Sequence, residues 1–288
     1  MRILCIFLIF LPFLLIDCFV EPNEQSQVYW NFAMAGNSLT LMNLILKQKV
    51  FMVRNIVLSV AILCVAGTIQ AQNLQLHFDP RNSLYGDKVG APVNYLTATF
   101  EMFKPDQWGS TFMFVDFDFN FDKRNPGLAY AEIAREFKIG DFPLLPHIEY
   151  NGGLGLVREK NFGFSIPSSY LGGFGYPFQL GNFFMSTYVA YKLNAFQEVS
   201  HDAQWTITWN SSLAGGKLSL GGFFDLWSEN KDRTGVESGK KLILLSEPQI
   251  WYNVTSQFAL GSEIELSYNF AGADKFYAIP TIATKWNF

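Results

Sequence analysis

The chain has 288 residues, of which 49% are hydrophobic and 17% aromatic, and its formal net charge is −4. Charged residues make up only 16% of it, against roughly 25% in an average soluble domain. The small acidic net charge leaves no basic footprint, so we expect no nucleic-acid partner.

The scarcity of cysteine and histidine excludes further classes of site. All three cysteines lie within the first 64 residues, so no disulfide framework or paired-cysteine metal site is expected in the rest of the chain. The three histidines, at positions 77, 147 and 201, are too far apart in sequence for a metal-ligand motif. We therefore expect neither a metal nor another cofactor.

The N-terminal region predicts export. Residues 52–71 begin with a methionine, continue with Arg54 and an apolar run, and end in small or polar residues before Gln72. This is the layout of a secretory signal peptide cleaved after Ala71.

A second apolar run, Ile3–Val20, precedes this signal and is interrupted by Pro12 and Asp17. It is compatible with an anchor helix or with a signal of its own. The alternative that we favour is that translation begins at Met52 and that residues 1–51 are an extension outside the native protein. The mature domain is then 72–288.

Twelve segments of this domain predict β-strands, because each is rich in β-forming residues and is bounded by turn residues. Their lengths, mostly about 10 to 14 residues, suit tilted strands that cross a bilayer. The expected strands are 73–80, 93–104, 110–121, 128–139, 145–157, 164–178, 182–194, 203–213, 217–228, 241–253, 258–270 and 276–288. The Gly and Pro content of the sixth segment is also typical of a loop.

Alternation along these strands separates two faces. In 110–121, Met113, Val115 and Phe117 alternate with Phe112, Phe114, Asp116 and Asp118. The last segment places Phe276, Ala278, Pro280, Ile282, Thr284, Trp286 and Phe288 on one mostly apolar face. A soluble β-sandwich alternates in the same way. The signal peptide, the aromatic content and the terminal Phe288 favour an all-β transmembrane antiparallel barrel of about twelve strands in the bacterial outer membrane.

Three motifs resemble a known group of proteins. The run EMFKPDQWGSTFMFVDFD (Glu101–Asp118), the segment Ala131–Ile139 and the segment Pro146–Gly153 resemble an uncharacterised family of Gram-negative outer-membrane proteins. That family is similar to the Tsx-like nucleoside-specific channel-forming porins. The resemblance implies a monomeric twelve-stranded barrel that passes nucleosides or similar small polar solutes. Ala134 departs from the acidic or polar residue that these porins tend to carry there, so their solute specificity need not transfer.

If the apolar faces contact lipid, the opposite faces line a lumen. The acidic and aromatic residues on those faces are our candidates for pore lining and solute binding: Tyr95, Glu101, Phe112, Phe114, Asp116, Asp118, Glu132, Glu136, Glu149, Asp225, Trp227, Glu247, Trp251, Glu263 and Glu265. Arg158 and Lys285 are possible ion-pair partners for the acids. Arg135 falls on the lipid face, so it should lie near a rim unless the register slips there.

Two other functions compete with the channel. An outer-membrane barrel can be an enzyme that acts on lipids, for which His147 or His201 would be the base and Ser165, Ser168 or Ser169 the nucleophile, but no motif links them. A barrel can also be closed and purely structural, since small barrels fill their interiors with side chains. We expect a passive channel rather than an enzyme.

Overall fold

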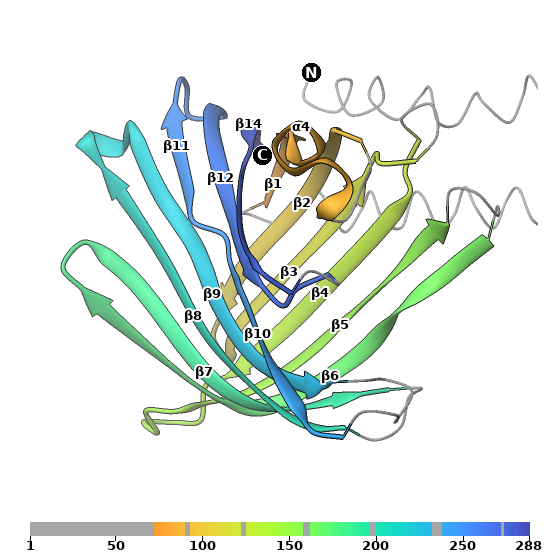
Figure 1. Cartoon of the computed structure of the whole chain (residues 1–288). Coiled ribbons are helices and arrows are strands. Elements are labelled where there is room, and N and C mark those ends of the chain that lie inside the picture. The colour runs from red at the N-terminus through yellow and green to blue at the C-terminus, as the bar shows by residue number, and fades with distance from the viewer. Residues whose placement is uncertain are drawn as a thin grey trace, which may run out of the picture. The chain divides into compact units, whose positions relative to one another are not determined.

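The computed structural model describes residues 72–89, 93–121, 125–157, 162–195, 200–231, 238–271 and 274–288. One antiparallel sheet that closes on itself dominates this part of the chain (Figure 1). The predicted extension, 1–51, and the predicted signal peptide, 52–71, lie outside the described residues. Both stay predictions.

The strands follow one another along the chain and pair with their sequence neighbours. They are β1 (Gln72–Asp79), β2 (Tyr95–Asp106), β3 (Gly109–Asp118), β4 (Leu128–Phe137), β5 (Leu145–Val157), β6 (Phe162–Leu180), β7 (Phe183–Asn194), β8 (His201–Leu213), β9 (Leu218–Asn230), β10 (Lys240–Ser246), β11 (Gln249–Asn253), β12 (Phe258–Tyr268), β13 (Phe276–Pro280) and β14 (Ile282–Asn287).

Over the described residues these segments make up twelve barrel-spanning strands, as predicted. We call each of them a stave, because two of them consist of two shorter strands in succession. β10 and β11 together form one stave between β9 and β12, and β13 and β14 form another between β12 and β1. Pro248, which has no N–H to donate, lies at the first interruption. The pairing of β1 with β14, with Asn73 opposite Asn287, closes the barrel.

The sixth stave is a strand and not a loop. β6 pairs with β5 and with β7 along most of its length, and a register shift between Asn151 and Gly153 of β5 absorbs an irregularity. A glycine-rich segment is a weak strand by itself, but here both neighbours supply hydrogen bonds to its backbone.

Side-chain burial is inverted relative to a soluble protein. Ile282 of β14 is 76% exposed on the outer face, whereas Gln75 and His77 of β1 are 1% and 4% exposed on the inner face. Because a soluble sandwich buries its apolar face, this distribution excludes that alternative. An apolar exterior around a polar interior is the arrangement of a transmembrane barrel.

Among the described residues, helical structure is confined to the connections. The β1–β2 connection contains α4 (Arg81–Tyr85) and the short helix η2 (Gly86–Lys88), and η4 (Ala214–Gly216) joins β8 to β9. In the part of the chain that the structure describes, no helix is both long and apolar enough to cross a membrane.

The two ends of the barrel differ. At the end we call the turn end, the amide of Phe288 donates to the carbonyl of Gln72 (3.0 Å), and residues 107–108 and 181–182 form tight hairpin turns. At the opposite end, the loop end, α4 follows β1 and residues 119–127 join β3 to β4. Short turns at one end and longer loops at the other are typical of outer-membrane barrels.

Candidate functional site: the barrel lumen

The strand register decides which side chains face the lumen. Buried Gln75 is paired with Thr99, Thr99 with Asp116, and Asp116 with Tyr130, so one inward row crosses β1 to β4. Continuing this alternation around the barrel puts the strand-borne candidates on the inner face: Tyr95, Glu101, Phe112, Phe114, Asp116, Asp118, Glu132, Glu136, Glu149, Asp225, Trp227, Trp251, Glu263 and Glu265. Contact of any of them with a solute stays a prediction.

Glu247 lies between two strands rather than within one. It is two residues from Leu245 and two from Gln249, which both face inward, and it interacts electrostatically with Glu263 and Glu265. The fifteenth candidate therefore joins the same acidic wall.

Carboxylates predominate on this wall. Inward-facing cations on the described strands include Lys192, Lys241 and Lys285, and the predicted partner Arg158 lies outside the described residues. The inner face also carries Asp79, Asp202 and Glu229, which the sequence analysis did not select. The described lumen is therefore rich in carboxyl groups.

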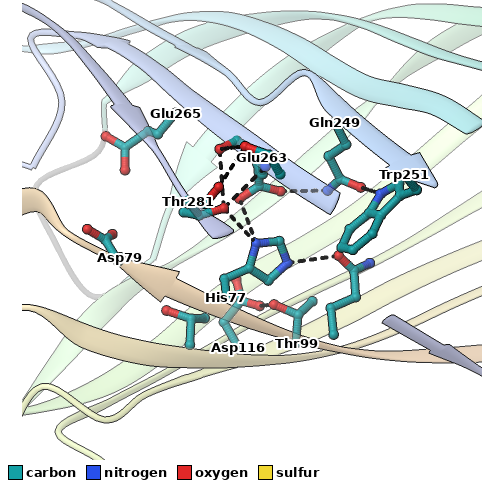
Figure 2. A network of polar contacts seen from close by, with 12 residues as sticks. His77, Asp79, Thr99, Asp116, Gln249, Trp251, Glu263, Glu265 and Thr281 are labelled. Carbon is teal, nitrogen blue, oxygen red and sulfur yellow. Dashed lines mark hydrogen bonds and ion pairs between the residues drawn. The ribbon is translucent and has the colours of Figure 1, made fainter. Parts of the chain in front are cut away.

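A hydrogen-bonded group that we call the His77 cluster links β1 to β11 and β12 (Figure 2). His77 Nδ1 lies 3.1 Å from the hydroxyl of Thr281, and its Nε2 lies 2.9 Å from Gln75 Oε1. The amide nitrogen of Gln249 donates to Glu263, and the indole N–H of Trp251 donates to Gln249 Oε1 at 2.9 Å. These bonds satisfy polar groups that would otherwise be costly to bury.

Trp251 is the largest side chain enclosed in this region, at 1% exposure. It packs with Ala259 and Ala283, and the ammonium of Lys285 lies 4.1 Å from the centre of its ring. A cation at that distance is attracted by the face of the indole. The Trp251–Lys285 pair thus fills the lumen beside β1.

The guanidinium of Arg81, in α4, forms ion pairs with two residues of the barrel wall near the loop end. Arg81 Nη2 lies 2.7 Å from Asp79 of β1 and 2.9 Å from Glu265 of β12, and all three side chains are largely buried. Its guanidinium also lies over the ring of Tyr95, at 5.3 Å. Tyr85, at the other end of α4, donates to the carbonyl of Ala278 (2.9 Å). The β1–β2 connection is therefore fastened to the barrel at two points.

A second polar group, the Glu149 cluster, comprises His147, Glu149 and Asn151 of β5 with Tyr188 of β7. His147 Nε2 and the hydroxyl of Tyr188 both approach Glu149 Oε2, at 2.9 and 2.7 Å. The rings of His147 and Tyr188 stack, with centres 3.9 Å apart. His147 is therefore a buried inward residue near the start of its strand.

Aromatic rings form a row on the inner face of β3 and β4. The rings of Phe112 and Phe114 have centres 6.0 Å apart, and that of Tyr130 lies 6.1 Å from Phe114. Phe112 and Phe114 are part-exposed, and Asp116 and Glu132 flank them on the same face. Flat apolar surface beside carboxylate acceptors suits a solute with a ring and several hydroxyls.

A cavity of about 450 Å³ opens at the turn end. Its lining includes Ser219, Asn253, Lys285 and Asn287, and loop residues 215–217 and 254–256 complete it. The volume falls within the roughly 300–1,000 Å³ usual for small-molecule sites. Lys285 lines this cavity and also contacts the ring of Trp251, so the cavity lies next to the Trp251–Lys285 pair.

Arg135 lies at the rim, as the sequence predicted for an unshifted register. Its guanidinium binds Asp106 in the β2–β3 hairpin through two bonds of 2.8 and 2.9 Å. It also donates to Thr111, its partner in the β3–β4 register (2.9 Å). The charge is therefore paired at the turn end and not left at bilayer depth.

Two of the serines named for the enzyme alternative contact groups other than a histidine. Ser169 donates to Asn194 Oδ1 (2.6 Å), and Ser168 lies 3.1 Å from the hydroxyl of Tyr150. His201 lies 2.7 Å from the hydroxyl of Tyr191, an exposed outward residue. Hydrolysis would need one of these serines beside His147 or His201.

Sequence reasoning missed several residues of the lumen. Lys192 and Tyr188 follow the inward alternation of β7, so extending the face assignment to that strand would have found them. Arg81 could not be found in this way, because it belongs to a connection. Across the residues that the structure describes, no group of three or more His, Cys, Asp or Glu side chains is arranged to hold a metal ion.

A closed antiparallel barrel with an apolar exterior, a polar interior and unequal ends is the outer-membrane type of β-barrel. The chain is thus an integral β-barrel protein of the bacterial outer membrane. More particularly, it belongs to the family described as "Domain of unknown function (DUF5020)", whose model matches residues 71–288.

Comparisons with individual proteins gave two further findings. No curated protein matches the chain. Among solved structures, the NanC porin is 10% identical, with a TM-score of 0.48 and coverage of 76% of this chain and 99% of that one. The outer membrane channel DcaP of Acinetobacter baumannii is 7% identical, with a TM-score of 0.33 and coverage of 76% and 72%. OccK5 of Pseudomonas aeruginosa is 11% identical, with a TM-score of 0.35 and coverage of 73% and 62%.

Proposed function

We propose that the protein is a passive channel for nucleosides or similar small polar solutes. The observation that carries this proposal is the inner wall, where carboxylates flank the part-exposed row of Phe112, Phe114 and Tyr130. A nucleoside has one flat base and several hydroxyls, so it can stack on such a row and donate to the carboxylates beside it.

The expected binding energy of a nucleoside on this wall is small enough to let the solute leave again. Stacking of a base on an aromatic side chain contributes about 1–3 kcal/mol. An electronegative lumen repels anions, so a neutral nucleoside or a cation should pass more readily than a phosphorylated nucleotide. We propose that the cavity at the turn end, beside Asn253 and Lys285, is a vestibule on the same route.

Planar-bilayer recording of the refolded protein tests the proposal. We expect a steady conductance, a reversal potential in a KCl gradient that indicates preference for K⁺, and partial block of the current by adenosine but not by glucose. A silent barrel that is correctly folded would count against any channel. Equal block by both solutes would count against nucleosides.

A matched pair of variants tests the aromatic row. Phe114→Leu should weaken adenosine block about tenfold, since it removes one stacking surface. Phe117→Leu, on the outer face of the same strand, should leave the block unchanged. Equal loss in both variants would show that the row has no special role.

We also propose that one barrel is the functional unit and that it functions embedded in outer-membrane lipid. Light scattering of the protein in detergent, corrected for the micelle, should give the mass of one chain. A stable trimer would contradict this.

A further inference from the structure

Three inward side chains of β5 have unsatisfied polar atoms. His147, Glu149 and Asn151 are 3%, 7% and 5% exposed. Among the described residues, His147 Nδ1, Glu149 Oε1 and Asn151 Oδ1 have no hydrogen-bond partner. The three residues alternate along one strand, so their side chains follow one another on the same face of the wall, about 7 Å apart. Buried polar atoms without a partner are rare, and a cluster of them points to a ligand.

The adjacent strand places one small side chain opposite these residues. On β4, Glu136 is opposite His147, Ala134 is opposite Glu149, and Glu132 is opposite Asn151. Ala134 therefore contributes only a methyl group between two glutamates, at the level of Glu149, and we call this position the gap. His147 Nδ1 and Glu136 Oε1 lie 3.7 Å apart across the upper part of this gap, too far for a hydrogen bond.

The atoms around the gap are mainly acceptors. Two nearby donors, His147 Nε2 and the hydroxyl of Tyr188, already point to the other oxygen of Glu149. The hydroxyl of Tyr130 donates to Glu132 Oε1 (2.7 Å). The inward cation Lys192 donates to neutral Gln204 (3.2 Å) and lies over the ring of Trp227, at 4.6 Å. The gap therefore contains an acceptor oxygen, Glu149 Oε1, that these donors do not satisfy.

We propose that this gap binds the primary ammonium group of a small organic cation. An ammonium carries three donors and one positive charge, which matches Glu149 Oε1, Asn151 Oδ1 and a glutamate of β4. A bound metal ion is a poorer match, because the described residues contain no group of three ligands arranged for one. This inference rests on the proposed channel function, since it assigns a second solute class to the same lumen.

Calorimetric titration of the refolded full chain in detergent tests the site with 1,4-diaminobutane. The uncharged control is 1,4-butanediol, which has the same length and hydrogen-bonding ends. We expect the diamine to bind and the diol not to bind at the same concentrations. Glu149→Gln should weaken diamine binding about tenfold, because it removes the charge while keeping an acceptor for His147 and Tyr188. Ala134→Leu should abolish binding by filling the gap without changing any charge.

Asp202→Asn is the matched control. It removes one carboxylate charge from the inner wall at a residue bound to Lys240 and Ser228, so diamine binding should change less than twofold. Equal weakening in Asp202→Asn and Glu149→Gln would overturn the site in favour of a general effect of lumen charge. Wild-type binding of the diol as tight as that of the diamine, or unchanged binding in Ala134→Leu, would also overturn it.

Failure of the site and failure of the channel are separable, because the titration needs no current. A silent barrel that binds the diamine refutes the channel and supports the site, whereas a conducting barrel that does not bind it refutes the site alone. Heat-modified gel mobility verifies that each variant is folded. If Glu149→Gln does not fold, Asn151→Ala takes its place, with severalfold weaker binding expected and unchanged binding as the overturning result.

Discussion

Replacing Arg81 by glutamine should release the β1–β2 connection while leaving the barrel closed. Arg81 holds Asp79 and Glu265 at 2.7 and 2.9 Å, and the exposed fractions of the three side chains are 13%, 6% and 12%. Removing one partner of a buried ion pair costs about 3–5 kcal/mol, because the remaining charge is left uncompensated. Since these side chains keep some exposure, we expect the lower end of that range.

That cost should fall on the local opening of α4 and not on global unfolding, because β1 and β14 close the barrel without Arg81. A loss of about 3 kcal/mol raises the opening equilibrium roughly a hundredfold. Hydrogen exchange followed by mass spectrometry should show this increase in residues 81–88, where the amide of Leu84 donates to the carbonyl of Pro80. The strands should exchange as in the wild type.

The control is Lys88→Gln, which removes one positive charge from an exposed residue of the same connection. Its exchange rates should stay within threefold of the wild type. An Arg81→Gln variant with exchange in 81–88 equally close to the wild type would refute the argument that this ion pair holds α4 in place.

Three further outcomes test the barrel itself. Trp251→Ala should empty an enclosed part of the lumen. We therefore expect the free energy of unfolding in urea titrations to fall by about 3–5 kcal/mol and the single-channel conductance to rise. An unchanged conductance would mean that Trp251 does not limit the pore. Ile282→Arg, on the outer face of β14, should cost about 2–4 kcal/mol, whereas Thr255→Arg in the turn between β11 and β12 should cost at most about 1; equal costs would contradict the assigned lipid face. In a lipase assay we expect no turnover above a vesicle blank, and turnover that His147→Ala abolishes would overturn the channel in favour of an enzyme.

Alternation predicted the faces of the strands well, because in a barrel one face always meets lipid and the other the lumen. The assignment of Asp116 and Asp118 to the side opposite Val115 and Phe117 agrees with the pairing of β3 with both neighbours. The apolar face of the last stave, which ends at Phe288, is likewise the outer face.

In the sixth predicted strand, pairing with distant segments of the chain decided the structure. The Gly- and Pro-containing sixth segment has little strand preference of its own, yet β6 extends from Phe162 to Leu180 because β5 and β7 hold it on both sides. The interruptions at Pro248 and at Thr281 were not predicted. In both staves the pairing resumes on the next residues, so the stave is continuous although its hydrogen bonding is not.

The functional candidates show the same division. Inward acids and aromatics followed from periodicity, whereas their partners did not, because partnership depends on strands distant in sequence. Arg81 reaches Glu265 across 184 positions, and His77 reaches Thr281 across 204. No local pattern encodes such a contact, and only the register of the closed sheet brings these side chains together.

The pairing of β1 with β14 also has a consequence for assembly. Until that last seam forms, the sheet has two free edges, each with a row of unpaired backbone N–H and C=O groups. The interior of the bilayer contains no water to bind these groups, so an intermediate with open edges would be unstable there by itself. The two seam strands are also the most distant in sequence, which makes their meeting a slow, late event. The barrel should therefore depend on a cellular factor that shields or templates its open edges until β14 arrives.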